Sequence, residues 1–160
     1  MGQQGRRAKE DAYELALKAL SYKERTESEL RGWLAERGME EAEIEEVLSL
    51  LGDAGALDDA SFARRYAEDK RELAGWGPDR IRTALEGRGV AAEHIDAAVA
   101  GEDQDRQLVR AVALLSDRGM SCSSERERDR ALGLLVRRGY ALELAYNAVR
   151  AAERDSREAA

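Results

Sequence analysis

The sequence of 160 residues predicts an all-α protein, arranged as an elongated, curved array of three tandem three-helix repeats. The first observation is a phrase ending in Arg37-Gly38, whose leucine, arginine and glycine recur at residues 85–89 and 135–139. The three glycines lie 51 and then 50 residues apart, a period typical of repeat architectures. The second observation is composition, because alanine, leucine, glutamate and arginine dominate and strand-like alternation is missing.

Each copy of the phrase predicts the end of one helix and the start of the next. The leucine lies in the last helical turn, the arginine complements the negative end of the helix dipole, and the glycine supplies the left-handed residue that ends the helix. Apolar residues four apart follow each glycine, for example Ile44 and Leu48, and form one stripe on the following helix. Each repeat therefore contains two helices around an arginine–glycine turn.

A further amphipathic helix precedes each pair. Its apolar face is expected to contain Tyr13, Leu17 and Leu20 in the first repeat, Phe62, Tyr66 and Leu73 in the second, and Leu108, Val112 and Leu115 in the third. Capping boxes that begin at Thr26 and Ser124, and Pro78 at a first helical position, predict where the middle helices start. We therefore expect repeats over residues 12–56, 57–101 and 102–155, a flexible N-terminal tail over 1–11 and a C-terminal tail over 156–160.

Residues that carry catalysis are scarce. A single histidine, a single cysteine and the lack of a glycine-rich phosphate loop leave no metal-ligand cluster, no nucleophile paired with a base and no nucleotide site. We therefore expect no enzyme, no catalytic residue, no cofactor and no metal. No segment approaches the roughly 20 apolar residues of a membrane span, and the first residues lack an apolar signal core, which predicts a cytoplasmic protein without membrane contact.

Charge is distributed unevenly along the chain. The net charge of −7 is concentrated in the first repeat (−6), whereas the second carries −2 and the third is neutral. An acidic total argues against a protein whose main affinity comes from neutralising DNA phosphates, because each phosphate contact requires a local cation. Local basic surfaces remain compatible with this balance.

An arginine stripe in the third repeat is the most informative of these surfaces. At about 100° per residue, Arg126, Arg130 and Arg137 share one helical face, opposite Leu132 and Leu135. The alternative interpretation is a solvated face with glutamate–arginine pairs. The candidate partner-binding residues are Arg126, Arg130, Gly133, Arg137 and Arg138 in the third repeat, with Gly133 allowing close approach, and Arg64 and Arg71 in the second.

Segments 19–30, 57–64, 77–89 and 134–140 resemble, in that order, parts of the RecX family of bacterial recombinase regulators, and the similarity covers about residues 12–150. The resemblance implies three tandem three-helix repeats without catalytic activity that bind RecA in the groove of its filament on single-stranded DNA. It also implies inhibition of filament growth, ATPase, strand exchange and coprotease activity, and hence modulation of recombination, DNA repair and the SOS response. The resemblance carries over no individual contact residue.

Two alternatives remain beside a monomer that regulates RecA. The first is a DNA-binding regulator, because two helices joined by an arginine–glycine turn resemble a helix-turn-helix whose second helix enters the major groove. Glu43, Glu45 and Glu46 on that helix would repel phosphates and allow only weak direct DNA contact. The second alternative is a helical adaptor for another protein.

Overall fold

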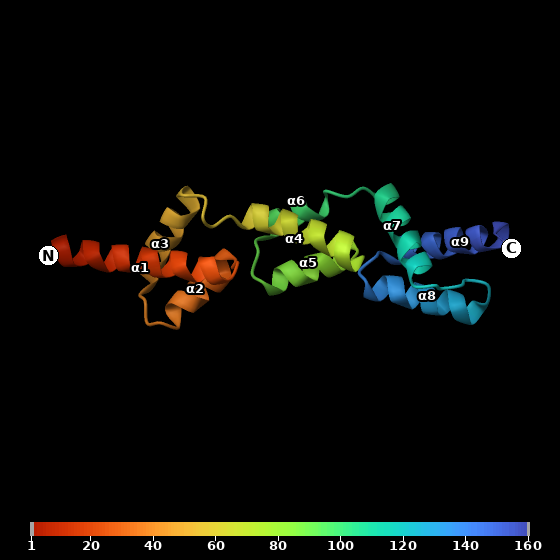
Figure 1. Cartoon of the computed structure of the whole chain (residues 1–160), viewed down its shortest axis with the longest axis horizontal. Coiled ribbons are helices and arrows are strands. Elements are labelled where there is room, and N and C mark those ends of the chain that lie inside the picture. Colours follow the sequence, from red (N-terminus) through yellow and green to blue (C-terminus); the bar gives the residue numbers. More distant parts are fainter. Residues whose placement is uncertain (1, 160) are drawn as a thin grey trace.

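The computed structural model describes residues 2–159, which form nine α-helices and no strand. Figure 1 shows the helices grouped along an elongated row, with the two chain ends at opposite ends of the row. This arrangement confirms the all-α repeat prediction. The helices are α1 (Gly2–Tyr22), α2 (Glu27–Ala35), α3 (Glu41–Asp53), α4 (Asp59–Ala74), α5 (Pro78–Gly87), α6 (Ala92–Val99), α7 (Gln104–Asp117), α8 (Glu125–Arg137) and α9 (Leu142–Glu158).

Capping residues fix where the middle helix of each repeat begins. Thr26 precedes α2 and Ser124 precedes α8, and each accepts a hydrogen bond from the backbone of the glutamate three residues later, which closes the predicted capping box. Pro78 is the first residue of α5, as predicted. At the other end of these helices, Gly38 and Gly89 adopt φ angles of +77° and +74°, so the predicted left-handed turns are confirmed.

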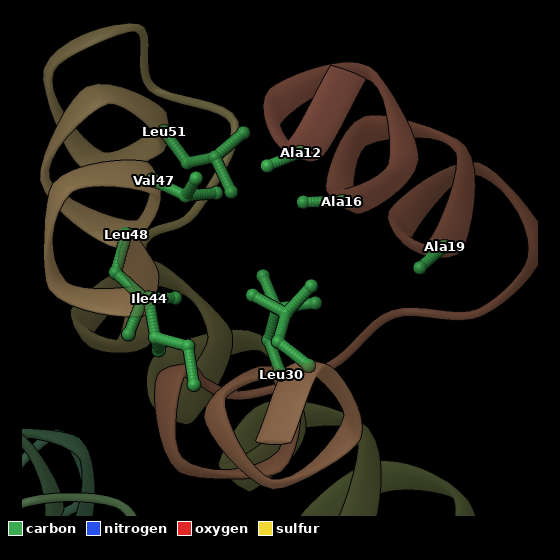
Figure 2. Close-up of a cluster of buried hydrophobic side chains, with 9 residues drawn as sticks. Ala12, Ala16, Ala19, Leu30, Ile44, Val47, Leu48 and Leu51 are labelled. Atoms are coloured by element: carbon green, nitrogen blue, oxygen red, sulfur yellow. The ribbon is translucent and has the colours of Figure 1, made fainter. Parts of the chain in front are cut away.

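Each repeat has its own hydrophobic core, and the helix pairs that pack most closely belong to one repeat. Figure 2 shows the first core, where Ala12, Ala16 and Ala19 of α1 face Leu30 of α2 and an aliphatic row on α3. The small alanine side chains allow α1 and α3 to approach closely. The core of α4–α6 contains Phe62, and that of α7–α9 contains the single cysteine and Tyr140.

The predicted buried faces of the first helices are partly wrong. Leu17 is 36% exposed and Leu73 is 85% exposed. In α1 the buried positions are the alanines, which lie one residue before the predicted bulky residues. Side-chain size misled the prediction, because close helix packing at these positions favours the smaller residue.

The described residues of both predicted tails are helical, since α1 extends to Gly2 and α9 extends to Glu158. Neither segment contains proline, and both are rich in residues that favour helix. Lys9 pairs with Glu46 of α3 at 2.7 Å, and Arg157 pairs with Glu153 at the same distance, so ion pairs also hold these terminal turns. No helix of the described chain is long and apolar enough to cross a bilayer.

Candidate functional site

A groove along the outer face of α8 brings together most of the predicted stripe. Its volume is about 740 Å³, and its lining consists of Arg118, Met120, Arg126, Asp129, Arg130, Leu134 and Arg137. The side chains of Arg126, Arg130 and Arg137 are exposed, whereas Ala131 and Leu135 on the opposite face are fully buried. Four arginines, one aspartate and two apolar side chains line the groove, so it suits an acidic partner that also presents an apolar side chain.

The arginines of α8 have different roles on different faces. Arg128 pairs with Glu153 of α9 at 3.3 Å and joins two helices of the repeat. The three stripe arginines form no ion pair within the described chain, which favours a contact surface over the solvated glutamate–arginine pairs of the alternative interpretation. Arg118 completes the groove from the end of α7, a position that helical periodicity on α8 alone could not reveal.

Gly133 lies in the stripe but does not leave an open surface. A Cβ atom built at this position would lie 3.0 Å from a terminal nitrogen of Arg137, one helical turn later. The Arg137 guanidinium therefore occupies the space where we expected a partner to approach. Gly133 acts by allowing this arginine to lie close to the helix.

Arg71, predicted as a contact residue, is mostly buried and only borders a hollow between the second and third repeats. Its side chain is 11% exposed, and it donates hydrogen bonds to the backbone oxygens of Ala98 (2.7 Å) and Val99 (3.1 Å). It also lies 3.5 Å from Glu102, whose other carboxylate oxygen accepts from Arg110 of α7 at 2.9 Å. Arg71 therefore joins α4 to α6 and to the third repeat, and burial lowers its pKa.

Arg64, predicted as the partner of Arg71, remains exposed on α4. It lines a separate hollow of about 350 Å³ between the second and third repeats, and the lining also includes Arg71, Arg106, Glu68 and Glu72. Mixed charges line this hollow, in contrast to the arginine-rich groove on α8. The structure therefore does not bring Arg64 together with the stripe.

Arg138 also has a structural position, at the joint between the second and third repeats. Its guanidinium donates to the backbone oxygen of Ala74, and desolvation lowers its pKa. The adjoining backbone continues the contact, because Gly77 N donates to the Arg138 oxygen at 2.7 Å and Tyr140 donates its hydroxyl proton to the Gly75 oxygen at 3.1 Å. Arg138 thus holds two repeats together and leaves the groove to its neighbours.

The joint between the first and second repeats uses the equivalent turn. Arg88 donates from Nε and from a terminal nitrogen to the two carboxylate oxygens of Glu29, at 2.7 and 2.9 Å. The hydroxyl of Thr26 donates to the Arg88 backbone oxygen at 2.7 Å. The Arg88 guanidinium also lies 4.5 Å from the ring centre of Phe62. A bidentate arginine–carboxylate pair over an aromatic ring is among the stronger polar contacts available.

Sequence reasoning missed this role of the recurring arginine and glycine, which it assigned to helix termination alone. In both joints the turn of one repeat docks on the start of the middle helix of the preceding repeat. The recurrence of arginine at the same place in all three phrases was the available signal. Any cation near this end would complement the helix dipole, so the dipole alone does not explain why the residue is arginine each time.

The Glu29–Arg88 pair predicts a pH dependence of stability. Its hydrogen bonds hold the pKa of Glu29 below the ordinary 4.5, so the folded-state pKa lies below the unfolded one. The pair therefore stabilises the protein above about pH 4.5 and is lost as the pH falls through the folded-state pKa. We expect the wild-type melting temperature to fall more steeply below pH 5 than that of Glu29→Gln, measured by circular dichroism.

The control for that experiment is Glu14→Gln, which replaces an exposed glutamate on α1. This variant should follow the wild-type curve at every pH. Equal slopes for Glu29→Gln and the wild type would show that the joint does not contribute to acid sensitivity.

The described residues contain no group of histidine, cysteine and carboxylates that could hold a metal ion. Cys122 is fully buried in the third core, and desolvation raises the pKa of its thiol.

Comparison with known proteins agrees with this organisation. Family models described as the first and second three-helix domains of RecX match residues 12–51 and 58–99. The regulatory protein RecX of Mycolicibacterium vanbaalenii is 34% identical over 158 residues, covering 93% of this chain and 86% of its own length. The regulatory protein RecX of Mycobacterium avium is also 34% identical, over 155 residues, with 92% and 90% covered.

Solved structures show the same fold. A crystal structure of RecX from Lactobacillus salivarius superposes with a TM-score of 0.82 at 22% identity, covering 91% of this chain and 96% of that one. A second crystal structure of a regulatory protein RecX gives a TM-score of 0.75 at 25% identity, with 89% and 71% covered. Since two family domains match and relatives above 30% identity align over almost their whole length, this chain belongs to the RecX family of regulatory proteins.

Proposed function

We propose that this chain acts in the cytoplasm, where it binds the filament that RecA forms on single-stranded DNA. Binding inhibits filament growth and the ATPase, strand-exchange and coprotease activities of RecA. Through this inhibition it modulates recombination, DNA repair and the SOS response. The observation that carries the proposal is the open arginine groove on α8 at one end of an elongated repeat array of the RecX family. No catalytic group is required, because regulation follows from occupancy of the filament surface.

The elongated form supports contact with several RecA protomers at once. The three repeats lie in a row (Figure 1), so each can face a different part of a regular polymer. Linked contacts add to one another through effective concentration, and weak individual sites then give tight binding overall. The groove supplies a contact whose strength depends on charge and therefore on salt.

The charge of α3 argues against major-groove DNA binding by the first repeat. Glu41 and Glu45 of α3 both pair with Arg31 of α2, and Glu43 is exposed beside them. A helix with this acidic surface would face phosphates unfavourably. In the helix-turn-helix alternative, the third helix of a repeat enters the major groove, and in the first repeat that helix is α3.

The test is addition of the protein to preformed RecA filaments on single-stranded DNA, with ATP hydrolysis followed over time. We expect the RecA rate to fall with added protein, because bound protein promotes filament shortening, while the protein alone hydrolyses no ATP. Filament length by electron microscopy provides the second readout. Unchanged turnover and length at saturating protein would contradict the proposal, and steeply salt-dependent binding to naked duplex would favour the DNA-binding alternative.

A further inference from the structure

The arginine–glycine turn of the first repeat lacks the contact that its two counterparts make. A Cβ atom built on Gly89 would lie 2.5 Å from the Ser28 side chain of the preceding repeat, whereas one built on Gly38 meets nothing within 4 Å. Arg37 and Gly38 are exposed. Within residues 2–159, no other part of the chain therefore covers the Arg37–Gly38 turn.

Arg37 is nevertheless held in a position that resembles the docked arginine. Its guanidinium lies 3.4 Å from the ring centre of Trp33, as that of Arg88 lies over Phe62. It also donates to the Trp33 backbone oxygen at 3.1 Å. Stacking restricts the side chain before any partner arrives, which lowers the entropy lost on docking.

The complementary surface is uncovered at the opposite end of the row, at the start of α8. Thr26 of the equivalent capping box in α2 is fully buried by the docked turn, whereas Ser124 is exposed. Glu127 uses one carboxylate oxygen to accept from the backbone of Ser123 and Ser124, at 3.1 and 3.0 Å. No guanidinium of the described chain pairs with Glu127, although Glu29 at the equivalent place holds Arg88.

We propose that the Arg37–Gly38 turn of one copy docks on the α8 capping box of a second copy, with Arg37 paired to Glu127. The occupied Thr26–Glu29 box supplies the template, because the same serine or threonine and glutamate chemistry already binds an arginine–glycine turn within the chain. Figure 1 shows α8 beginning near the C-terminal end, and the turn between α2 and α3 lying toward the other end. Such a contact is head-to-tail because it joins two different surfaces, so it can add further copies in a row.

The length of α8 agrees with a contact at the end of the molecule. Fifteen residues separate Ser124 from Gly139, whereas twelve separate Thr26 from Gly38, so α8 contains nearly one additional turn. The additional helical turn places the α8 capping box about 4.5 Å further along the helix axis from Gly139. A second copy can therefore reach the box beyond the end of the third repeat.

The contact between free copies is weak, because two chains lose translational and rotational freedom that a tethered repeat does not lose. It becomes effective at about 1 mM, the local concentration of tethered or side-by-side neighbours. Copies aligned on the filament of the proposed function would meet this condition. The contact itself does not depend on that function.

Sedimentation equilibrium of the protein alone, up to about 1 mM, tests the proposal. The wild type is expected to associate with increasing concentration, whereas Arg37→Glu and Glu127→Arg each weaken association by about tenfold or more through like-charge contacts. An equimolar mixture of the two variants is expected to regain association, because each turn then meets a box of opposite charge. Circular dichroism verifies that both variants are folded.

The matched control is Arg7→Glu, which makes the same charge change on an exposed part of α1 and should leave association unchanged. A wild type that stays monomeric to about 1 mM overturns the proposal. Association that survives either reversal, or a mixture that fails to recover it, also overturns it. RecA is absent from this experiment. A negative result would therefore overturn only the contact between copies, and the proposed function would still be tested separately by RecA ATP hydrolysis.

Discussion

Replacing Arg126, Arg130 and Arg137 by glutamate is expected to weaken the proposed inhibition of RecA by about 100-fold, since placing like charges opposite one another costs several kcal/mol and each 1.4 kcal/mol is a factor of ten. The three side chains are exposed on α8, opposite buried Ala131 and Leu135, so the fold should be retained. The measurement is the protein concentration that halves RecA ATP hydrolysis on single-stranded DNA. Circular dichroism gives the folding control.

A matched variant separates the groove from overall charge. Arg7, Arg150 and Arg154 are exposed and lie outside the groove, so their change to glutamate alters net charge equally without touching the site. This control should inhibit within a fewfold of the wild type. The difference between the two triple variants should shrink at high salt, because exposed charges are screened. Equal inhibition by both at low salt would exclude the groove from the RecA contact.

Glu102→Ala is expected to lower stability more than loss of a residue from an exposed ion pair. The Glu102 carboxylate is 5% exposed and lies between Arg71 and Arg110, so its removal leaves buried guanidinium charge without a counterion. Loss of one member of a buried pair costs about 3 kcal/mol. For a chain of this length we expect a fall in melting temperature on the order of 10 °C.

Asp96→Ala is the control for this prediction. Asp96 pairs with Arg82 at 2.7 Å, but the two side chains are 63% and 38% exposed. Loss of a surface pair costs about 0.2 to 1 kcal/mol, so the melting temperature should change little. Glu102→Gln should lie between the two, because its amide oxygen can still accept from Arg110. Similar melting of the two alanine variants would contradict the assigned role of Glu102.

The local pattern of the sequence was sufficient to predict the helices, because their signals lie within a few residues of each boundary. The capping boxes at Thr26 and Ser124, the proline that begins α5 and the turn at Gly38 all occur where predicted. The size of a hydrophobic side chain was a poorer guide to whether it is buried. Leu73 is exposed, whereas Ala63 and Ala67 of the same helix are fully buried, because close packing of α4 on α6 favours small residues.

The candidate site was predictable where it depends on one helix and unpredictable where it depends on two repeats. Helical periodicity alone placed Arg126, Arg130 and Arg137 on one exposed face. The same reasoning could not distinguish buried Arg71 from exposed Arg64, because Arg71 pairs with Glu102, which follows α6 in the chain. Nor could it assign Arg88 to Glu29, which lies 59 residues earlier in the chain.

That sequence separation has a consequence for synthesis on the ribosome. The first core is complete once Leu57 has emerged, since its residues all precede that point, but the first joint also needs Arg88. Domains generally fold as units in order from the N-terminus, and distant contacts form later than local ones. The capping box of α2 therefore stays open to water until the second repeat has folded, and each new repeat closes the one before it.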